Sequence, residues 1–363
     1  MNPRKTVYTL LLRMEKGAYS PILLNNALSE KNIIQRDKAF ITALFYGVIE
    51  RKLTIDYVIA KHAAKKPDTE TLVILRMALY QIMYMNSVPD SAAVNEAVNL
   101  APSRSKGYVN AILRNILREK TSPKFDGLSV EYSCPQWLID KWTSEYGAEN
   151  TLQILQTSLQ KPPIFERNGY IQDESSYKAC VLLAPKEGET ILDLCAAPGG
   201  KSFTLARLME NTGRIISCDI NKNKLALVER TARKLGFSII ETRVNDGKVF
   251  NSALPKADRV LCDVPCSGLG VIRRKPEIKY KSESEFEKLP QIQLQILKTS
   301  ANYVKDGGFL MYSTCTLSKA ENDDVVSAFA NGNSDFELIE KKTSFPEKNG
   351  GDGFFAALFC KPV

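Results

Sequence analysis

The chain has 363 residues, of which 44% are hydrophobic and 25% are charged, as in ordinary folded proteins. This length predicts two domains or one large one, and the composition excludes collagen-like, disulfide-rich and intrinsically disordered proteins. No apolar run approaches the ~18 residues that a membrane span needs, and the first residues lack the apolar region of a signal peptide. The eight cysteines are scattered along the chain, which is typical of a reducing compartment. We therefore expect a cytoplasmic protein with no membrane partner.

The net charge of +8 is confined to the first third of the chain. Residues 1–130 hold 19 Lys and Arg against 11 Asp and Glu, whereas residues 131–363 hold 30 of each. Such an asymmetry is typical of a polyanion-binding module attached to a neutral domain. A solvated helical surface explains the charge equally well, so charge alone does not decide between the two interpretations.

Apolar residues at three- and four-residue spacing predict helices throughout the first part of the chain. We expect these helices at 6–14, 36–49, 72–85, 92–100 and 108–117. Residues 1–125 are therefore predicted to form a small all-α domain. Residues 126–170, in which prolines surround one helical stretch at 137–159, are predicted to be a connector or a reduced subdomain.

From residue 171 to residue 363, short apolar runs alternate with helical patterns. Strands are expected at 190–194, 214–219, 239–244, 259–263, 309–313, 336–339 and 354–359. Helices are expected between them, at 201–209, 223–235, 289–304 and 319–330. This alternation predicts a mostly parallel α/β sheet covered by helices. In such sheets ligands bind at the carboxyl ends of the strands, and the candidate motifs all fall there.

The segment 193–202 closes an apolar strand and opens a helix with the sequence Asp-Leu-Cys-Ala-Ala-Pro-Gly-Gly-Lys-Ser. It is not a P-loop, because Cys195 stands where that motif needs a glycine, and the dinucleotide fingerprint G-x-G-x-x-G is absent. Its small residues would let the backbone approach a ligand closely. A plain tight strand-to-helix turn would explain one glycine but not the whole decapeptide.

Acidic residues follow the next two predicted strands, in Cys218-Asp219-Ile220 and in Asn245-Asp246-Gly247. A carboxylate at the end of the second strand can accept hydrogen bonds from the ribose hydroxyls of a nucleoside. The third strand end would then meet an adenine edge. Each acidic strand end is weak evidence alone, but three in succession favour a nucleoside-containing ligand.

Two further strands end in cysteine motifs, Asp263-Val264-Pro265-Cys266 and Ser313-Thr314-Cys315-Thr316. Two cysteines that each end a parallel strand should face the same crevice. A zinc site built from Cys262, Cys266 and Cys315 is the alternative, but paired C-x-x-C ligands are missing and the single His62 lies in another domain. We therefore expect no metal. The spacing does not decide which cysteine would act as a nucleophile.

Together these segments resemble the S-adenosylmethionine (SAM)-dependent RNA cytosine-C5 methyltransferases. In the first domain, Arg36-Asp37-Lys38-Ala39, Tyr46-Gly47-Val48 and the run Ala92-Ala93-Val94-Asn95-Glu96-Ala97-Val98 resemble a NusB-like RNA-binding domain. The combination is similar to the bacterial 16S rRNA methyltransferases of the Sun (RsmB) type. The resemblance implies an all-helical NusB-like domain followed by a Rossmann-like, seven-stranded methyltransferase domain. It implies methyl transfer from SAM to carbon 5 of a cytosine in RNA, most readily 16S rRNA, through a covalent Cys–C6 intermediate.

The resemblance also assigns roles by position. Cys315 would be the nucleophile, with Cys266 and Asp263 as the other catalytic residues. The SAM site would contain Cys195, Ala196, Ala197, Pro198, Gly199, Gly200, Lys201, Asp219, Asp246 and Asp263. RNA contacts are expected at Arg273, Arg274, Lys275 and Arg167, although a solvated loop explains the basic run as well.

The chain departs from the family pattern in its middle. Pro162-Pro163-Ile164-Phe165-Glu166-Arg167 runs almost directly into Gln172-Asp173, where family members carry a sizeable RNA-contacting segment. We expect this shortening to affect RNA binding and to leave the cofactor pocket intact. Three alternatives stay open: a catalytically silent RNA-binding protein, a SAM methyltransferase acting on another RNA such as tRNA, and one acting on a small molecule. We expect a monomer whose partner is RNA.

Overall fold

The computed structural model describes residues 2–17, 20–29, 33–119 and 125–363. The chain divides into two compact units, Met1–Asp140 and Lys141–Val363. Residues 120–124, beside which the sequence places the end of the helical domain, lie outside the described residues. In the part of the chain that the structure describes, no helix is long and apolar enough to cross a membrane.

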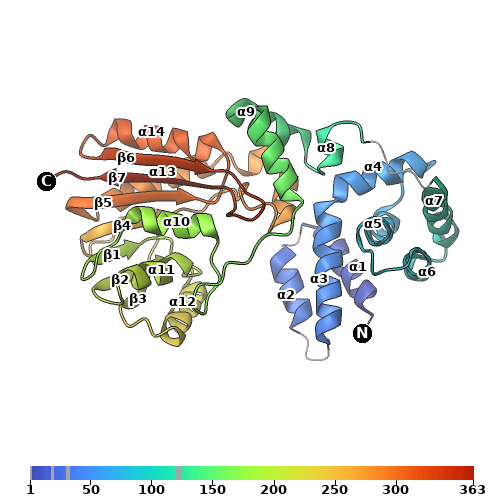
Figure 1. The fold of residues 1–363 in the computed structure, drawn as a ribbon, viewed down its shortest axis with the longest axis horizontal. Coiled ribbons are helices and arrows are strands. Elements are labelled where there is room, and N and C mark those ends of the chain that lie inside the picture. Colours follow the sequence, from blue (N-terminus) through green and yellow to red (C-terminus); the bar gives the residue numbers. More distant parts are fainter. Residues whose placement is uncertain (1, 18–19, 30–32, 120–124) are drawn as a thin grey trace. The chain divides into compact units, whose positions relative to one another are not determined.

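The described part of the amino-terminal unit contains only helices among its regular elements, as predicted (Figure 1). They are α1 (Pro3–Met14), α2 (Ser20–Leu28), α3 (Gln35–Glu50), α4 (Lys52–His62), α5 (Thr69–Tyr84), α6 (Asp90–Leu100), α7 (Lys106–Glu119) and α8 (Leu128–Glu131). Helix α5 is buried on most of its circumference and packs against α1, α3, α4, α6 and α7, so it forms the centre of this unit. Its amino terminus is capped by Asp68, which accepts a hydrogen bond from the backbone N–H of Thr71 at 2.8 Å.

The core of this unit also contains a charge. The guanidinium group of Arg76 is only 6% exposed and donates to both carboxylate oxygens of Asp56, at 2.6 and 2.7 Å, and to Glu15 at 2.8 Å. A buried cation held on two carboxylates is used for internal packing rather than for ligand binding. Part of the positive charge of this unit is therefore neutralised inside it.

The carboxyl-terminal unit is built on one seven-stranded sheet with the order β3-β2-β1-β4-β5-β7-β6 (Figure 1). The strands are β1 (Thr190–Asp193), β2 (Arg214–Asp219), β3 (Ile240–Val244), β4 (Ala257–Asp263), β5 (Val304–Thr314), β6 (Glu337–Ser344) and β7 (Phe354–Cys360). Strands β1 to β5 pair in parallel, whereas β7 runs antiparallel to both β5 and β6. The predicted seven-stranded, mostly parallel sheet is confirmed.

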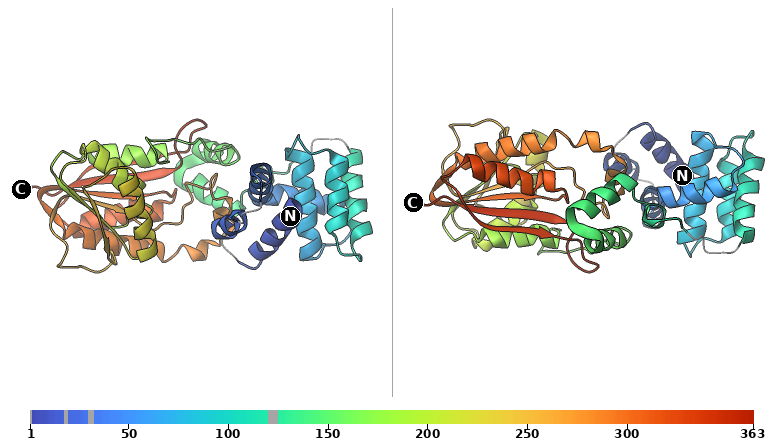
Figure 2. Two further views of the ribbon diagram at one scale, coloured as in Figure 1. Left: turned by 90° about the horizontal axis from the view of Figure 1, so that it is seen from below. Right: turned by 90° about the horizontal axis from the view of Figure 1, so that it is seen from above.

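Helices cover both faces of this sheet (Figure 2). Alternate strand residues such as Leu192 and Val260 pack with α13 (Leu289–Ala301) and α14 (Asp323–Gly332), whereas Ile191 and Leu261 pack with α10 (Glu174–Leu183) and α11 (Gly200–Leu208). Helix α12 (Lys222–Lys234) lies against β2 and β3. Strands buried on both faces must be apolar throughout, which explains their continuous apolar runs in the sequence.

The segment before this sheet consists of α9 (Gln136–Ser158), which has non-helical backbone at Gly147, and a tight antiparallel turn. In that turn Glu166 pairs with Ile171, and the N–H of Arg167 donates to the carbonyl of Tyr170 at 2.7 Å. The two residues at its tip, Asn168 and Gly169, both have positive φ, which such a turn requires. The chain therefore closes compactly where the sequence departs from the family pattern.

The strand order reverses between β1 and β4, since the chain leaves β3 at one edge and returns beside β1. Ligands bind at such a switch point in open α/β sheets. The carboxyl ends of the two strands carry Asp193 and Asp263. The fold thus brings the segment 193–202 and the motif around Cys266 to the same edge.

Candidate active site

A cavity of about 260 Å³ opens at the carboxyl ends of β1, β4 and β5. Its walls include seven of the residues predicted to bind the cofactor: Cys195, Ala196, Ala197, Pro198, Gly200, Lys201 and Asp263. Cys315 also lines it. Gly199, Asp219 and Asp246 are not on its wall, although they lie in neighbouring segments.

The turn between β1 and α11 forms one side of the cavity. It is held in place by the N–H of Leu194, which donates to Leu261 on β4, and by the N–H of Ala196, which donates to Cys218 on β2. Gly199 has φ of +107°, and a Cβ there would lie 2.5 Å from the ring of Phe203. The position therefore needs glycine, because any side chain would be both strained and blocked.

The other two predicted acidic strand ends lie next to this turn. The N–H of Asn245 donates to the carbonyl of Asp219 at 3.2 Å, which joins the ends of β2 and β3. Gly247 packs beside the first turn, since a Cβ there would be 3.8 Å from Cys195 Sγ. The three strand ends are therefore contiguous, as the sequence predicted.

Asp193 supplies a buried carboxylate to the cavity wall. Its Oδ2 accepts a hydrogen bond from Ser202 Oγ at 2.7 Å, while its Oδ1 is buried without a partner in the described residues. Burial raises the pKa of Asp193 to about 7. A buried acceptor without a partner, on a residue of the cavity wall, is suited to a ligand that brings a positive charge or a hydrogen-bond donor.

Lys201 and Asp263 form an ion pair across the cavity. Lys201 Nζ lies 2.7 Å from Asp263 Oδ2, and Ser313 Oγ donates to Asp263 Oδ1, also at 2.7 Å. Burial alone would lower the pKa of Lys201, but the charge and hydrogen bond of Asp263, together with Cys180 and Cys315, hold the pKa above its ordinary value. The pair therefore presents a fixed cation and a fixed carboxylate side by side.

Cys266 and Cys315 converge, with their Sγ atoms 3.2 Å apart. The hydrogen bond with Cys266 holds the pKa of Cys315 below its ordinary value against the effect of burial, and the charges of Lys201 and Lys275 act in the same direction. The same hydrogen bond, together with burial and the charge of Glu321, raises the pKa of Cys266. The site thus contains one thiol prepared to ionise and one prepared to keep its proton.

Cys262 does not join this pair. It lies in the core on β4, where its thiol donates to the carbonyl of Met311 at 3.3 Å and burial raises its pKa to about 12. Among the described residues, no group of three or more His, Cys, Asp or Glu could hold a metal ion. The zinc alternative therefore lacks its third ligand.

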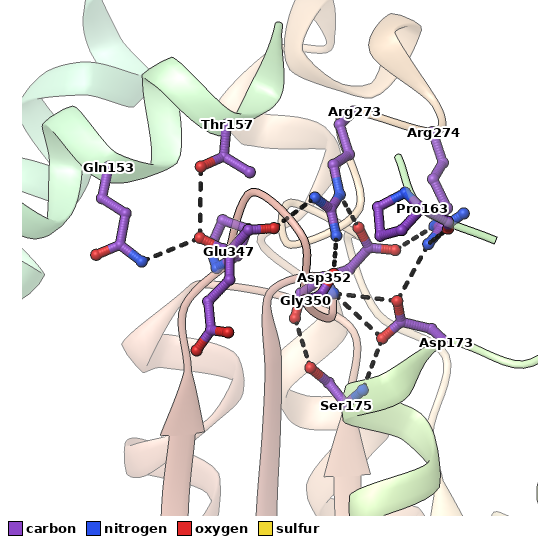
Figure 3. Close-up of polar contacts among 11 residues, drawn as sticks. Gln153, Thr157, Pro163, Asp173, Ser175, Arg273, Arg274, Glu347, Gly350 and Asp352 are labelled. Carbon is purple, nitrogen blue, oxygen red and sulfur yellow. Dashed lines mark hydrogen bonds and ion pairs between the residues drawn. The ribbon is translucent and has the colours of Figure 1, made fainter. Parts of the chain in front are cut away.

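Arg273 and Arg274 correct the prediction of RNA contacts (Figure 3). Arg273 is buried: Nε pairs with Asp352, and the two terminal nitrogens donate to the carbonyls of Glu347 and Gly350, both at 2.8 Å. Arg274 donates to Asp352 and Asp173 and to the carbonyl of Pro163. Arg273 is bonded at all three nitrogens, so it builds the site rather than contacts RNA. Arg274 uses Nε and one terminal nitrogen in the same way, although its side chain is 27% exposed.

The other two predicted RNA contacts have different surroundings. Lys275 is exposed and near Cys315, so it remains a candidate. Arg167 pairs with Glu174, and its guanidinium carbon lies 3.6 Å from the ring centre of Tyr177. It therefore also contributes to local packing.

The sequence interpretation missed several cavity residues: Ile171, Gln172, Asp173, Ser176, Val271, Asp352 and Phe354. Asp173 caps α10 by accepting the N–H of Ser175 at 2.9 Å, and its carboxylate also accepts the N–H of Asp352 (Figure 3). An acidic residue before a helical run was the one available signal for Asp173. Nothing in the sequence pairs it with a residue 179 positions away.

Comparison with known proteins fits this geometry. Residues 1–118 match the NusB family, and residues 180–360 match the family described as 16S rRNA methyltransferase RsmB/F. The probable ribosomal RNA small subunit methyltransferase B of Bacillus subtilis is 36% identical, over 97% of each chain. The chain belongs to the RsmB/F family of 16S rRNA methyltransferases. Membership confirms the predicted class of enzyme, a SAM-dependent RNA methyltransferase with a NusB-like domain.

Two further similarities agree with this assignment. The ribosomal RNA small subunit methyltransferase B of Proteus mirabilis is 29% identical, over 92% of each chain. The crystal structure titled PH0851 has a TM-score of 0.76 at 23% identity, covers 99% of both chains and supports the fold. The alignment with the Bacillus protein has 435 positions, 72 more than the 363 residues of this chain, so part of that relative has no counterpart here.

The residues present fit SAM. Its sulfonium and ammonium groups are cations, and Asp193 offers an unpartnered carboxylate oxygen in the cavity wall. The turn at 195–200 has the small residues that a close backbone approach needs, and Asp219 ends the neighbouring strand.

Proposed function

We propose that this protein methylates carbon 5 of a cytosine in ribosomal RNA, using Cys315 as a covalent nucleophile. The observation that carries the proposal is the pair of thiols, 3.2 Å apart, beside Lys201 and Asp263 in one cavity. Amino or small-molecule methyltransferases have no need of two converging cysteines. The relatives named as rRNA small subunit methyltransferases support ribosomal RNA rather than tRNA as the substrate.

Carbon 5 of cytosine needs activation, because it is a poor nucleophile. The thiolate of Cys315 would add to C6 and form an enamine that carries electron density to C5. Asp263, carrying a proton that it donates to N3, would stabilise the negative charge that this addition creates, and Lys201 would hold the resulting carboxylate in place. SAM, when bound, supplies the methyl group as an electrophile on sulfonium. A water positioned by the Cys266 thiol would accept the C5 proton and pass it to solvent, and the Cys315 thiolate would then leave.

The cytosine must be unpaired or flipped out, because C6 is shielded inside a stacked helix. RNA loops present such bases readily. The exposed cation of Lys275 beside the cavity and the NusB-like unit would supply phosphate contacts. The proposed cofactor roles of Asp219 and Asp246 rest on their place at the ends of β2 and β3.

A methyl-transfer assay tests this function. Purified protein is incubated with radiolabelled SAM and with unmodified 16S rRNA, tRNA or a small-molecule mixture, and the labelled nucleoside is identified by mass spectrometry. We expect label in 5-methylcytidine from 16S rRNA only. Label in another nucleoside or in tRNA would overturn the proposed substrate, and RNA binding without transfer would establish the catalytically silent alternative.

Asp193 predicts a pH dependence of cofactor binding. With a pKa of about 7, its carboxyl group must lose a proton before it can pair with a cation. We expect the affinity for SAM to weaken by up to ~tenfold for each pH unit below about 7. Calorimetric titrations with SAM between pH 5.5 and 8 measure this affinity. Asp193→Asn should bind SAM weakly, and its affinity should lack the pH dependence that Asp193 causes. An unchanged pH profile in Asp193→Asn would contradict the role.

The same group affects folding with the opposite sign. Its pKa is raised from 3.8 to about 7, so the fold favours the protonated carboxyl. The contribution of Asp193 to stability is therefore fully present below pH 3.8 and is lost as the pH rises through about 7. In urea unfolding without SAM, the difference between Asp193→Asn and wild type should grow in favour of the variant over this range.

A further inference from the structure

A buried carboxylate lies between the two loops that carry the cysteines. Glu321 belongs to the short helix η3 (Lys319–Glu321), is only 2% exposed, and has no part in the chemistry described above. Its Oε2 accepts the backbone N–H of Ser267 at 2.9 Å, and its Oε1 accepts the Ser267 hydroxyl at 2.5 Å. Ser267 is the residue after Cys266, so the carboxylate holds the Cys266 loop directly.

The same carboxylate connects to both loops through two other side chains. Ser267 Oγ lies 2.6 Å from Thr316 Oγ1, and Thr316 follows Cys315. Gln293 Nε2, from α13, donates to Glu321 Oε2 and to the carbonyl of Pro265, both at 2.9 Å. The neighbours of Cys266 on both sides and one neighbour of Cys315 are thus fixed to one group.

A carboxylate is the side chain that suits this position. It faces the N–H of Ser267, the hydroxyl of Ser267 and the amide of Gln293, all of which can donate to it. Glutamine at 321 would have a single acceptor oxygen, and its own NH₂ group would face one of these donors. The two side chains have nearly the same shape, so this substitution tests the hydrogen bonds and the charge.

The charge of Glu321 acts mainly on Cys266. The groups that raise the pKa of Cys266 include Cys315 and Glu321. Asp263 raises the pKa of both thiols, whereas the cations Lys201 and Lys275 lower that of Cys315. The hydrogen bonds and the charges therefore act in the same direction: both favour a protonated Cys266 beside an ionised Cys315.

We propose that Glu321 is a positioning residue that holds Cys266 against Cys315 and thereby controls the release of the methylated product. This inference rests on the proposed function, in which Cys266 serves the last stage. Cys315 would still attack C6 without Glu321, but removal of the C5 proton and departure of Cys315 would slow. A misplacement of about 1 Å costs up to ~10²-fold in rate.

The test separates attack from release in Glu321→Gln. Attack is measured as covalent trapping by RNA that contains 5-fluorocytosine, and release as turnover on ordinary RNA. We expect trapping within about threefold of wild type, turnover reduced up to ~10²-fold, and a covalent adduct that accumulates on ordinary RNA. Ser267→Ala, which removes only the hydroxyl contacts, should show a smaller effect of the same kind and serves if Glu321→Gln does not fold.

A second measurement reports on Cys266 without turnover. Alkylation of Cys266 by iodoacetamide is followed against pH by mass spectrometry, and Glu321→Gln should shift the profile to lower pH. Asp323→Asn is the matched control: this carboxylate is 27% exposed, pairs with Lys341 at 2.6 Å, and lies two residues further on. It should leave both trapping and the alkylation profile unchanged.

The outcomes distinguish this inference from the function on which it rests. If wild type forms no adduct, the proposed function fails, and this inference fails with it. If wild type is trapped but Glu321→Gln loses trapping and turnover equally, or loses neither, only the role of Glu321 is overturned. An unmoved alkylation profile would reduce Glu321 to a structural residue.

Discussion

Replacing Cys315 by alanine is expected to abolish the covalent adduct with RNA and to lower methyl transfer by ~10⁴-fold or more, as when an enzyme loses its nucleophile. The pKa of the Cys315 thiol is lowered by its hydrogen bond with Cys266 and by the charges of Lys201 and Lys275. Cys266→Ala should behave differently. It should still form the adduct but resolve it slowly, so that protein crosslinked to ordinary RNA accumulates. The adduct of each variant with RNA is measured by denaturing gel electrophoresis after incubation with SAM.

The pair provides its own control, because each variant removes one thiol from the same cavity. An adduct between Cys315→Ala and RNA containing 5-fluorocytosine would show that the assignment is reversed and that Cys266 attacks. Cys262→Ala is a third comparison. Its thiol lies in the core and bonds Met311, so the variant should lose some stability but keep the adduct.

Replacing Arg273 by methionine is expected to destabilise the carboxyl-terminal unit by about 3–5 kcal/mol. The side chains of Arg273 and Asp352 are only 1% and 2% exposed, so the variant leaves a buried carboxylate with Arg274 as its remaining charged partner. Two backbone carbonyls, of Glu347 and Gly350, also lose the hydrogen bond from the guanidinium group. For a unit of this size the melting temperature should fall by about 10 °C in scanning calorimetry.

Lys305→Met is the matched control for Arg273→Met. Lys305 pairs with Asp258 at 2.8 Å, but the two side chains are 45% and 32% exposed. Solvent screens such a pair, and its loss should cost less than about 1 kcal/mol. Equal shifts in the two variants would contradict the structural role assigned to Arg273.

Much of the site could be predicted because it depends on strand ends. Apolar runs located β1, β2 and β4 within one or two residues, and parallel strands present their carboxyl ends at one edge. Cys266 and Cys315 could therefore be expected to converge although 49 residues separate them. Strand β6 was predicted too short, at 336–339, because it is an exposed edge strand without an apolar pattern.

Arg273 and Arg274 could not be predicted correctly from the sequence. A run of basic residues in a loop is usually solvated, and the partner that buries them, Asp352, lies almost 80 positions further on. Similarly, the expected helix at 319–330 is divided into η3 and α14. The break lets Glu321 accept from Ser267 and Gln293, which local helical periodicity does not indicate.

The wall of the active-site cavity is complete only when β7 has joined the sheet. Strand β6 precedes β7 in the chain, and among the described strands it pairs with β7 alone. Strand β6 therefore has no place on the sheet until β7 has docked on β5. The turn that joins them ends at Asp352 and leads into Phe354, both of which face the cavity. The docking of β7 on β5 therefore completes both the edge of the sheet and the active-site cavity. A substitution that weakens the pairing of β7 with β5 should lower the rate of methyl transfer even when it lies far from both thiols.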